Sequence, residues 1–544
     1  MDLPYVILLA RALKVRGVTH VFGMPGGATL PFLDAFREEG IEFVLVRHEG
    51  AAGFMADAAF HITRKPGVCI ATLGPGATNL VSGVAGSLLE RSKVVAITNQ
   101  IGTELRGRYT HQILDQVALF KPVARRVVHL EPTMAAMQTL TALASLDRQT
   151  PGPVVLDVPS EVTSTVIPDA DPKWGMHPRP RPVPDVQYAA ELLREARRPM
   201  VVVGCGELSI AAANGVRRLV QAADAVALTT YRAAGMADEA HPLWAGTFGL
   251  SPVVDAHQRS LFEQADLMIA VGLDIVELRP QWLPGWPEQL PILSIDAFGQ
   301  EDLLGQIVEE LTGPLMETLD ALREAAFGEP PEDDPDAVLH TTEWSAPQLE
   351  AHRAAWRAPF ADGPDGPAAT IRAVQEGSPE GTRISLDVGA HRITAAHVLR
   401  AVTPNQILQS NGLSSMGTGL PGAITSRLVD PKTPALALTG DAGLWMTLGE
   451  LGIVQERGLD LVVVYLADAS LSLIQLKQER LELTDHGVTF DNPKVEPLAR
   501  AFGGVGVSVQ GADAVRAAVV AAHARGGLTI IEARIDPSAY RQQM

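Results

Sequence analysis

Cysteine is nearly absent from this chain, which has two in 544 residues. Cys69 and Cys205 both lie in apolar runs that are typical of buried strands, so we expect core thiols in a reducing compartment rather than a disulfide. Long apolar runs are missing too. The run Val6–Ala10 is too short to span a membrane, and no signal-peptide cleavage site follows it. These absences predict a cytoplasmic protein without a membrane partner.

Positive charge is also scarce. The 44 Lys and Arg residues are outnumbered by 63 Asp and Glu residues, which gives a formal net charge of −19. Such an acidic chain repels phosphate backbones, and this argues against nucleic acid as a partner. The hydrophobic content of 46% and the charged content of 20% are typical of an ordinary globular protein.

The length of the chain is too great for one hydrophobic core, so we expect several domains. Strand-like and helix-like patterns alternate in three blocks, residues 1–165, 186–325 and 346–544, which predicts an α/β fold with three doubly wound parallel sheets. A proline-rich stretch, Pro168–Pro184, cannot form a helix or a central strand. It is predicted to be a linker, and so is the acidic stretch at residues 327–345.

Residues 434–477 of the last block have the clearest chemical pattern. The apolar run Ala435–Leu438 leads into a glycine-bearing turn with Asp441, and the apolar run Leu461–Leu466 leads into Asp468. In a parallel β-α-β unit the turns after both strands lie on one edge of the sheet, so the two carboxylates should converge. Oxygen ligands beside glycine backbone suit a hard cation that also holds phosphates. An ordinary Rossmann-like turn with an incidental aspartate is the alternative.

This stretch resembles the diphosphate-binding motif of thiamine diphosphate (ThDP) enzymes, Gly-Asp-Gly followed further along by Asn-Asn. Here Gly440-Asp441-Ala442 and Ala467-Asp468 occupy those places, so Ala442 replaces a glycine and Ala467-Asp468 replaces the asparagine pair. The resemblance implies Mg²⁺ ligands at Asp441, Asp468 and Ser470. The additional charge of Asp468 should alter the affinity for a diphosphate. The resemblance covers essentially the whole chain and is closest to the acetolactate synthase-like branch, whose three domains are pyrimidine-binding, central and diphosphate-binding.

In the first block the resemblance assigns a proton-transfer role to Glu49, which follows a strand and precedes a helix. In the family the matching glutamate hydrogen-bonds N1′ of the aminopyrimidine ring and so promotes removal of the thiazolium C2 proton. A glutamate that is merely stabilised by a helix dipole is the alternative. The turn with Pro75 and Asn79 resembles the family segment that closes over the cofactor from a neighbouring subunit. Gly26 is similarly placed and leaves room above the thiazolium.

Two further positions concern the substrate. Acetolactate synthases and benzaldehyde lyase-like carboligases carry a glutamine near the start of the segment 106–122. Gln112 is the better match and His111 is its neighbour, with a polar surface loop as the alternative for both. Lys477 stands where the biosynthetic enzymes carry a tryptophan that lines the acceptor site. It follows Ile474, whose family counterparts look over C2, by one helical turn, so it either binds an anionic substrate group or is a solvated surface lysine.

The third block contains the remaining cofactor contacts that the resemblance implies. The backbone N–H groups of Gly389 and Ala390 and the imidazole of His391 would face phosphate oxygens. Met416 matches the methionine that wedges between the two cofactor rings, and the carbonyl of Ser414 would accept a hydrogen bond from the amino group. The other implied contacts are Val388, Gly440, Asp441, Ala442, Gly443, Asp468, Ser470, Leu471 and Ile474.

The sequence supports a second cofactor, FAD, less well than it supports ThDP. Acetolactate synthases usually bind a structural FAD in the central domain, marked by glycine-rich runs and an arginine–aspartate cluster. Here Gly246-Thr247-Phe248-Gly249 and Leu273-Asp274-Ile275 keep the spacing loosely and lack the cluster, which leaves FAD doubtful.

The resemblance implies ThDP- and Mg²⁺-dependent, non-oxidative chemistry on small 2-oxo acids. A carboligase that joins the product of decarboxylation to a second carbonyl compound, such as an aldehyde, is the leading interpretation. A simple 2-oxo acid decarboxylase or an aldehyde lyase is the second. A catalytically degenerate binding or regulatory protein of the same fold is the third, motivated by Ala442, Ala467 and Asp468. Because Glu49 and Asp441 lie in domains that the family joins across a subunit interface, we expect a homodimer or a homotetramer.

Overall fold

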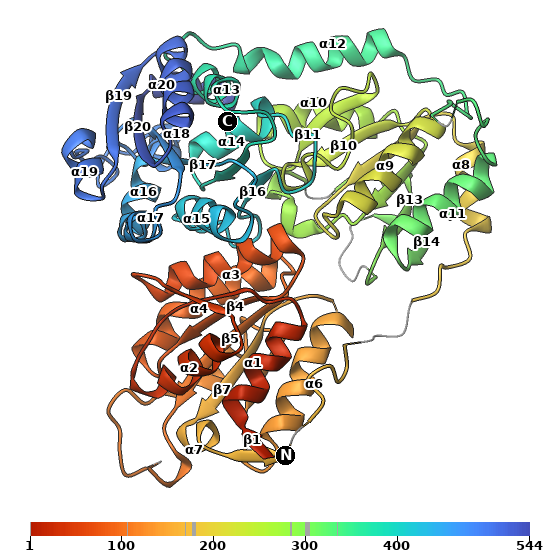
Figure 1. Cartoon of the computed structure of the whole chain (residues 1–544). Helices are drawn as coiled ribbons and strands as arrows, with labels where there is room; N and C mark the ends of the chain where they lie inside the picture. The colour runs from red at the N-terminus through yellow and green to blue at the C-terminus, as the bar shows by residue number, and fades with distance from the viewer. Residues whose placement is uncertain are drawn as a thin grey trace.

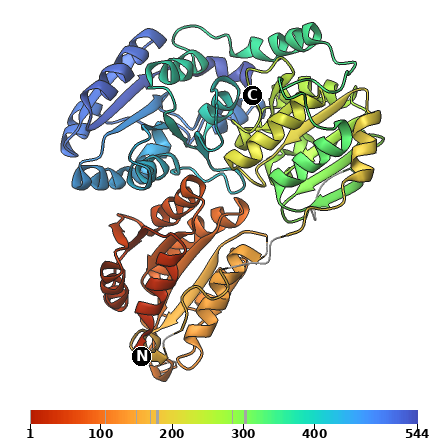
Figure 2. The ribbon, with the colours of Figure 1, turned by 45° about the vertical axis from the view of Figure 1, so that its right-hand side comes forward.

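The computed structural model describes residues 2–105, 107–148, 150–168, 170–176, 181–282, 285–299, 305–334 and 336–544. They form three domains, each built on a six-stranded parallel sheet with helices on its faces (Figure 1). The first domain lies below the other two, which stand side by side in both views (Figures 1 and 2). The predicted α/β class with three doubly wound parallel sheets is confirmed, and the domain bounds given above stay predictions.

The first sheet has the spatial order β3-β2-β4-β5-β7-β6. Its strands are β2 (His20–Met24), β3 (Glu42–Leu45), β4 (Gly67–Ala71), β5 (Val94–Gln100), β6 (Arg126–His129) and β7 (Val154–Pro159). Its helices are α1 (Tyr5–Val15), α2 (Leu30–Glu38), α3 (Glu49–Thr63), α4 (Pro75–Leu89), α5 (Gln116–Phe120), α6 (Ala135–Arg148) and α7 (Ser160–Thr163). A small antiparallel sheet pairs β1 (Asp2–Pro4) with β8 (Val166–Pro168). Strands β4, β5 and β7 are buried throughout, because a parallel sheet is covered on both faces.

The central sheet has the order β11-β10-β9-β12-β13-β14. Its strands are β9 (Pro199–Val203), β10 (Val226–Thr230), β11 (Trp244–Phe248), β12 (Leu267–Val271), β13 (Pro291–Asp296) and β14 (Gln306–Thr312). Its helices are α8 (Gln187–Glu195), α9 (Ile210–Ala222), α10 (Pro252–Phe262) and α11 (Leu315–Phe327). The next helix, α12 (Ala346–Arg357), runs along the top of Figure 1 toward the third domain and buries Trp356 in the central core.

The third sheet has the order β16-β15-β17-β18-β20-β19. Its strands are β15 (Arg383–Leu386), β16 (Ile407–Gln409), β17 (Ala435–Gly440), β18 (Leu461–Ala467), β19 (Val505–Gln510) and β20 (Leu528–Arg534). Its longer helices are α13 (Pro367–Gly377), α14 (Ala390–Val398), α15 (Gly419–Val429), α18 (Ser472–Arg480) and α20 (Ala512–Arg525). Its shorter helices are α16 (Asp441–Thr447), α17 (Leu451–Arg457), α19 (Val495–Ala501) and α21 (Tyr540–Gln543).

The first and third domains share one hydrophobic core. Ala52 and Met55 of α3 belong to the same buried cluster as Ala423 and Ile424 of α15, which places the two helices against each other (Figure 1). The other side of α3 packs so closely on α4 that a Cβ at Gly53 would lie 2.6 Å from the backbone of α4. The helix that begins with Glu49 is therefore held rigidly between its own domain and the third domain.

Three further expectations bear on the class of protein. Cys69 and Cys205 are both free and buried, as predicted from their apolar surroundings. Among the described residues, no helix has the length and apolar character needed to cross a bilayer. The predicted linker Pro168–Pro184 lies partly outside the described residues, since 169 and 177–180 are not among them. The same is true of residue 335 in the predicted linker 327–345.

Candidate active site

Two carboxylates lie at the carboxyl ends of neighbouring strands in the third sheet. Strands β17 and β18 pair in parallel, with Gly440 opposite Leu466. Asp441 follows β17 directly and Asp468 follows β18. The turns are joined by a hydrogen bond of 2.8 Å in which the N–H of Ala469 donates to Oδ2 of Asp441. The convergence expected of a parallel β-α-β unit is therefore present.

The two carboxylates are held in place by hydrogen bonds, and burial raises the pKa of each. Asp441 is 2% exposed and accepts from the N–H of Ala442 at 2.8 Å and from the side-chain amide of Asn492 at 2.9 Å. Asp468 accepts from the hydroxyl of Ser472. Burial raises the pKa of Asp441. Burial, with a further contribution from the charge of Asp441, raises the pKa of Asp468 to about 6. A divalent cation would relieve this repulsion.

A cavity of about 240 Å³ opens above these carboxylates. Every third-domain residue that the sequence predicts to contact the cofactor lines it: Val388, Gly389, Ala390, His391, Ser414, Met416, Gly440, Asp441, Ala442, Gly443, Asp468, Ser470, Leu471 and Ile474. Lining residues that the sequence did not indicate are Leu466, Ser472, Leu473 and Tyr540. The structure thus brings four separate sequence segments to one cavity, and a fifth through Tyr540 near the end of the chain.

One end of the cavity suits an anion. Helix α14 begins there, after Gly389, and no side chain caps its free N–H groups. His391 is buried, and its Nε2 has no hydrogen-bond partner among the residues that the structure describes. Burial lowers the pKa of His391 to about 3, so the imidazole is neutral, and its Nε2 donates an N–H to an oxygen in the tautomer that carries the proton there rather than on the nitrogen beside the Asp387 backbone. These donors fit a diphosphate.

Asp387 organises this end of the cavity, a role that the sequence reasoning missed. Its buried carboxylate accepts from the N–H of Gly417 at 2.8 Å and from the hydroxyl of Thr439 at 2.8 Å. A Cβ at Gly443 would lie 2.1 Å from its Oδ2. One carboxylate therefore joins the loop with Met416, strand β17 and helix α16. The only signal in the sequence was an aspartate directly after an apolar strand.

The metal site predicted from the sequence does not have a full set of protein ligands among the described residues. Among the described residues, no group of three or more His, Cys, Asp or Glu side chains could hold a metal ion. Mg²⁺ needs only one or two carboxylates when phosphate oxygens complete its shell, so Asp441 and Asp468 with the hydroxyl of Ser470 fit that arrangement. The Ser470 hydroxyl donates to Oε1 of Gln475 at 2.6 Å, which leaves its oxygen lone pairs free for a cation.

Glu49 lies in a different cluster, in the first domain. It is the first residue of α3, it is 6% exposed, and its Oε2 accepts from the side-chain amide of Asn79 on α4 at 2.9 Å. Pro75 begins the same helix α4. These side chains are therefore grouped together, but no first-domain residue is among those that line the cavity in the same chain.

Glu450, from the third domain, fixes the backbone directly before Glu49. Its carboxylate accepts from the N–H groups of Arg47 and His48, each at 3.0 Å. Burial raises the pKa of Glu450 to about 7. The start of α3 is thus tied to the short helix that follows α16, and sequence reasoning did not indicate this contact because the partners are some four hundred residues apart.

The other first-domain predictions gather around the turn after β4. A Cβ at Gly26 would lie 2.5 Å from Oγ1 of Thr72, so this turn packs closely on the end of β4. The backbone of Gln112 packs against Gly74, while the side chains of Gln112 and His111 are exposed. A glutamine that the sequence reasoning passed over, Gln116, is buried and accepts from the N–H of Gly74 at 3.0 Å.

Lys477 lies on α18 and is exposed; it does not line the cavity. Ile474, one turn earlier on the same helix, does line it and is 48% exposed. A second cavity, of about 490 Å³, lies between the first and central domains, with Arg64 and Arg91 on the first-domain side and Gly206, Ser209 and Phe298 on the central-domain side. Nothing in this cavity tests the prediction from the sequence about FAD binding.

Comparison with known proteins gives matches along the whole chain. Three family models match in order: "Thiamine pyrophosphate enzyme, N-terminal TPP binding domain" at residues 6–119, "central domain" at 186–322 and "C-terminal TPP binding domain" at 387–533. The acetolactate synthase isozyme 2 large subunit of Escherichia coli (strain K12) is 29% identical over 521 residues, which cover 94% of this chain and 92% of that protein. The acetolactate synthase of Bacillus subtilis (strain 168) is 27% identical, over 98% and 93%.

The three models match the three sheets described above, and the cavity lies within the stretch matched by the C-terminal model. The alignments with these two relatives cover nearly all of this chain and nearly all of each relative. The resemblance inferred from the sequence motifs is thereby confirmed. The chain belongs to the thiamine pyrophosphate (ThDP) enzymes, in the superfamily that contains acetolactate synthase.

Proposed function

We propose that this chain is a ThDP- and Mg²⁺-dependent carboligase of the acetolactate synthase type. It decarboxylates a small 2-oxo acid and joins the product to a second carbonyl compound. The observation that carries the proposal is the single cavity in which all the third-domain residues predicted to contact the cofactor meet around Asp441 and Asp468. The acetolactate synthases among the relatives support the reaction type.

The residues of the third domain hold the cofactor. Asp441, Asp468 and Ser470 bind Mg²⁺ through oxygen, while the N–H groups at the start of α14 and His391 bind the diphosphate. When bound there, ThDP would supply the carbon nucleophile and the electron sink that decarboxylation of a 2-oxo acid requires. Ser414 and Met416 orient the rings, and the apolar side chains of Leu471 and Ile474 keep water from the reacting carbon.

A second copy of the chain completes the site. Glu49 is required to exchange a proton with the aminopyrimidine, yet it lies in the first-domain cluster and not in the cavity of its own chain. Apolar side chains at or near the cavity are left exposed, with Met446 at 62% and Ile474 at 48%. Exposed apolar surface of this kind marks an interface, and we infer at least a homodimer.

The test is a panel of 2-oxo acids supplied with and without aldehyde acceptors, scored for CO₂ and for ligated product. We expect both products to depend on ThDP and Mg²⁺, and both to be lost in Asp441→Ala. CO₂ without ligated product for every acceptor would indicate a simple decarboxylase, and cleavage of the ligated product alone would indicate a lyase. Failure of the purified protein to take up ThDP with Mg²⁺ would reject the proposal in favour of a binding or regulatory protein.

A further inference from the structure

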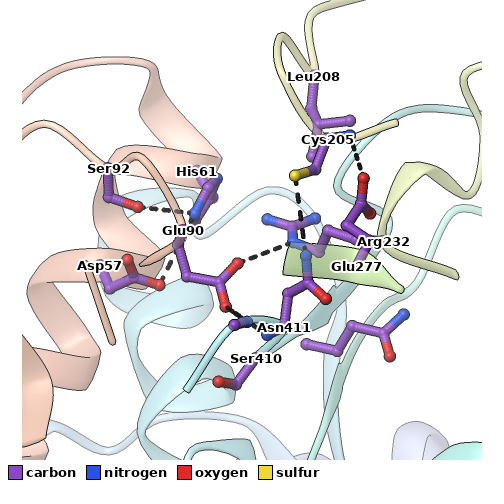
Figure 3. A network of polar contacts seen from close by, with 12 residues as sticks. Asp57, His61, Glu90, Ser92, Cys205, Leu208, Arg232, Glu277, Ser410 and Asn411 are labelled. Carbon is purple, nitrogen blue, oxygen red and sulfur yellow. Dashed lines mark hydrogen bonds and ion pairs between the residues drawn. The ribbon is translucent and has the colours of Figure 1, made fainter. Parts of the chain in front are cut away.

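A buried polar network lies where the three domains meet (Figure 3). At its centre is Glu90, which follows the last residue of α4 and is 6% exposed. Its Oε1 accepts from the backbone N–H groups of Asn411 and Gly412, the latter at 3.1 Å. Its Oε2 lies 3.7 Å from Nε of Arg232. A first-domain carboxylate is therefore bonded to a third-domain loop and paired with a central-domain guanidinium.

Arg232 joins the same junction from the central domain. It is 2% exposed, and its Nη1 donates to Oδ1 of Asn405 at 3.1 Å. The hydroxyl of the neighbouring Tyr231 donates to Oδ1 of Asn411. Buried charges of this kind are stable only when paired, because removing one partner leaves the other uncompensated. The domains therefore fix one another at this loop.

The loop that Glu90 holds leads directly into the candidate active site. Asn411 and Gly412 follow β16, and Ser414 and Met416, which line the cavity, come next. The hydroxyl of Ser414 donates to the carbonyl of Asn411 at 2.6 Å, and Ser414 has a φ of 52°. A non-glycine residue in the left-handed region costs free energy and persists only where its neighbours fix it. The position of Asn411 thus determines the direction of the Ser414 carbonyl.

We propose that Glu90 is a positioning residue for the cofactor: by holding the N–H groups of Asn411 and Gly412, it fixes the loop that presents Ser414 and Met416 to the cavity. The proposal rests on the proposed function, since it concerns the same site. Glu90 does not line the cavity and acts only through the loop. Its hydrogen bonds are buried and charge-assisted, so they are stronger than bonds between neutral groups.

Glu277 provides a matched control. It is a buried carboxylate of the central domain in the same network (Figure 3). It accepts from the backbone N–H of Cys205 at 2.9 Å and from the hydroxyl of Thr230, both within its own domain. Glu277→Gln therefore makes the same substitution at the same junction without altering a direct hydrogen bond to the loop. Because burial raises the pKa of Glu277 to about 8, this substitution removes less charge at pH 8 than Glu90→Gln does.

Two measurements at pH 8 compare Glu90→Gln and Glu277→Gln with wild type. One is the Kd for ThDP at saturating Mg²⁺, and the other is hydrogen–deuterium exchange of the peptide 405–418 in the cofactor-free protein. Glu90→Gln should weaken ThDP binding about tenfold and speed the exchange, because a buried charged hydrogen bond is lost. Glu277→Gln should change neither. If Glu90→Gln does not fold, Glu90→Asp replaces it: the charge stays beside Arg232, but the shorter side chain cannot reach both N–H groups.

The pH dependence separates positioning from a general loss of stability. Burial, and next the charge of Asp57, raises the pKa of Glu90 to about 7. The carboxylate is therefore ionised at pH 8 and largely protonated at pH 6, where wild type should resemble Glu90→Gln. The ratio of the two Kd values should fall from about ten toward one between these pH values. The other charged and titratable groups around Glu90 are Asp57, His61, Arg64, Arg91, Cys205, Tyr231, Arg232, Glu277 and Arg392.

The outcomes distinguish this proposal from the proposed function. Equal ThDP binding by Glu90→Gln and wild type, or an equal loss in both variants, overturns the positioning role. A ratio of Kd values that does not change with pH overturns it as well. A wild-type protein that binds no ThDP rejects the proposed function instead, and the exchange comparison then still decides whether Glu90 holds the loop.

Discussion

At the scale of single residues, the carboxylates of Asp441 and Asp468 repel each other when no cation lies between them. Burial and the charge of Asp441 raise the pKa of Asp468 to about 6. When folding raises the pKa of a carboxyl, the folded chain binds the proton more tightly than the unfolded chain does. The free energy of unfolding therefore falls as the pH rises from the pKa in the unfolded chain toward the pKa in the folded chain. The cofactor-free protein is therefore less stable above pH 6 than it would be with a neutral group at this position.

Replacing Asp468 with asparagine, the residue that the family motif carries here, should remove this cost. We expect the free energy of unfolding of cofactor-free Asp468→Asn to exceed that of wild type by about 3 kcal/mol at pH 8. The gain should vanish near pH 4, where the wild-type carboxyl is protonated in the folded chain. Urea unfolding at the two pH values measures the difference, and a gain of the same size at both would contradict the explanation.

Lys477 is a second residue-scale case, because its position on α18 allows two roles. It follows the cavity residue Ile474 by one helical turn, so its stem could reach the mouth while the ammonium contacts an anionic substrate group. Lys477→Met should then raise KM severalfold for a carboxylate-bearing acceptor and leave kcat nearly unchanged. Lys432→Met, at an exposed lysine on the opposite edge of the sheet, is the control. Identical kinetics with charged and neutral acceptors would make Lys477 a surface residue.

At the scale of elements, the close contact between α16 and β15 depends on one glycine. A Cβ at Gly443 would lie 2.1 Å from Oδ2 of Asp387, which is already bonded to Thr439 and Gly417. Gly443→Ala should therefore displace the Asp387 carboxylate and cost about 2 kcal/mol of unfolding free energy, together with much of the affinity for ThDP. Gly363→Ala, where an added Cβ meets no atom within 4 Å, is the control in urea unfolding and ThDP titration. A Gly443→Ala protein as stable as the control would contradict this packing.

In the third domain, the convergence of Asp441 and Asp468 was predictable from local rules, whereas the other cavity residues were predicted from the family resemblance. The turns after β17 and β18 meet because parallel β-α-β units place them on one edge, and short apolar runs marked both strands. The same reasoning could not find Asn492, Tyr540 or Glu450, because their contacts join segments far apart in the sequence. Gln116 was missed for a related reason. The buried glutamine that holds Gly74 follows the exposed Gln112, and only tertiary packing distinguishes them.

At the scale of the whole molecule, the proposed function divides the site of each chain into two halves. The cavity of the third domain holds the residues proposed to bind Mg²⁺ and diphosphate, and the cluster around Glu49 holds the proposed proton-transfer group. Within one chain, α3 packs on α15 and Glu450 bonds to the backbone before Glu49, so these contacts connect the two domains without bringing Glu49 into the cavity. Two copies can complete two equivalent sites by exchanging these halves.

The measurement that tests this account most directly mixes two inactive variants, Glu49→Gln and Asp441→Ala, under conditions that exchange subunits. Hydrogen–deuterium exchange at C2 of bound ThDP is the readout. Each variant alone should lose activity by a factor of roughly 10² to 10⁴ or more. In a mixed dimer one site combines an intact Asp441 with an intact Glu49 from the partner, so random mixing should restore about one quarter of the wild-type exchange. No recovery in dimers shown to be mixed would contradict a site shared between two chains.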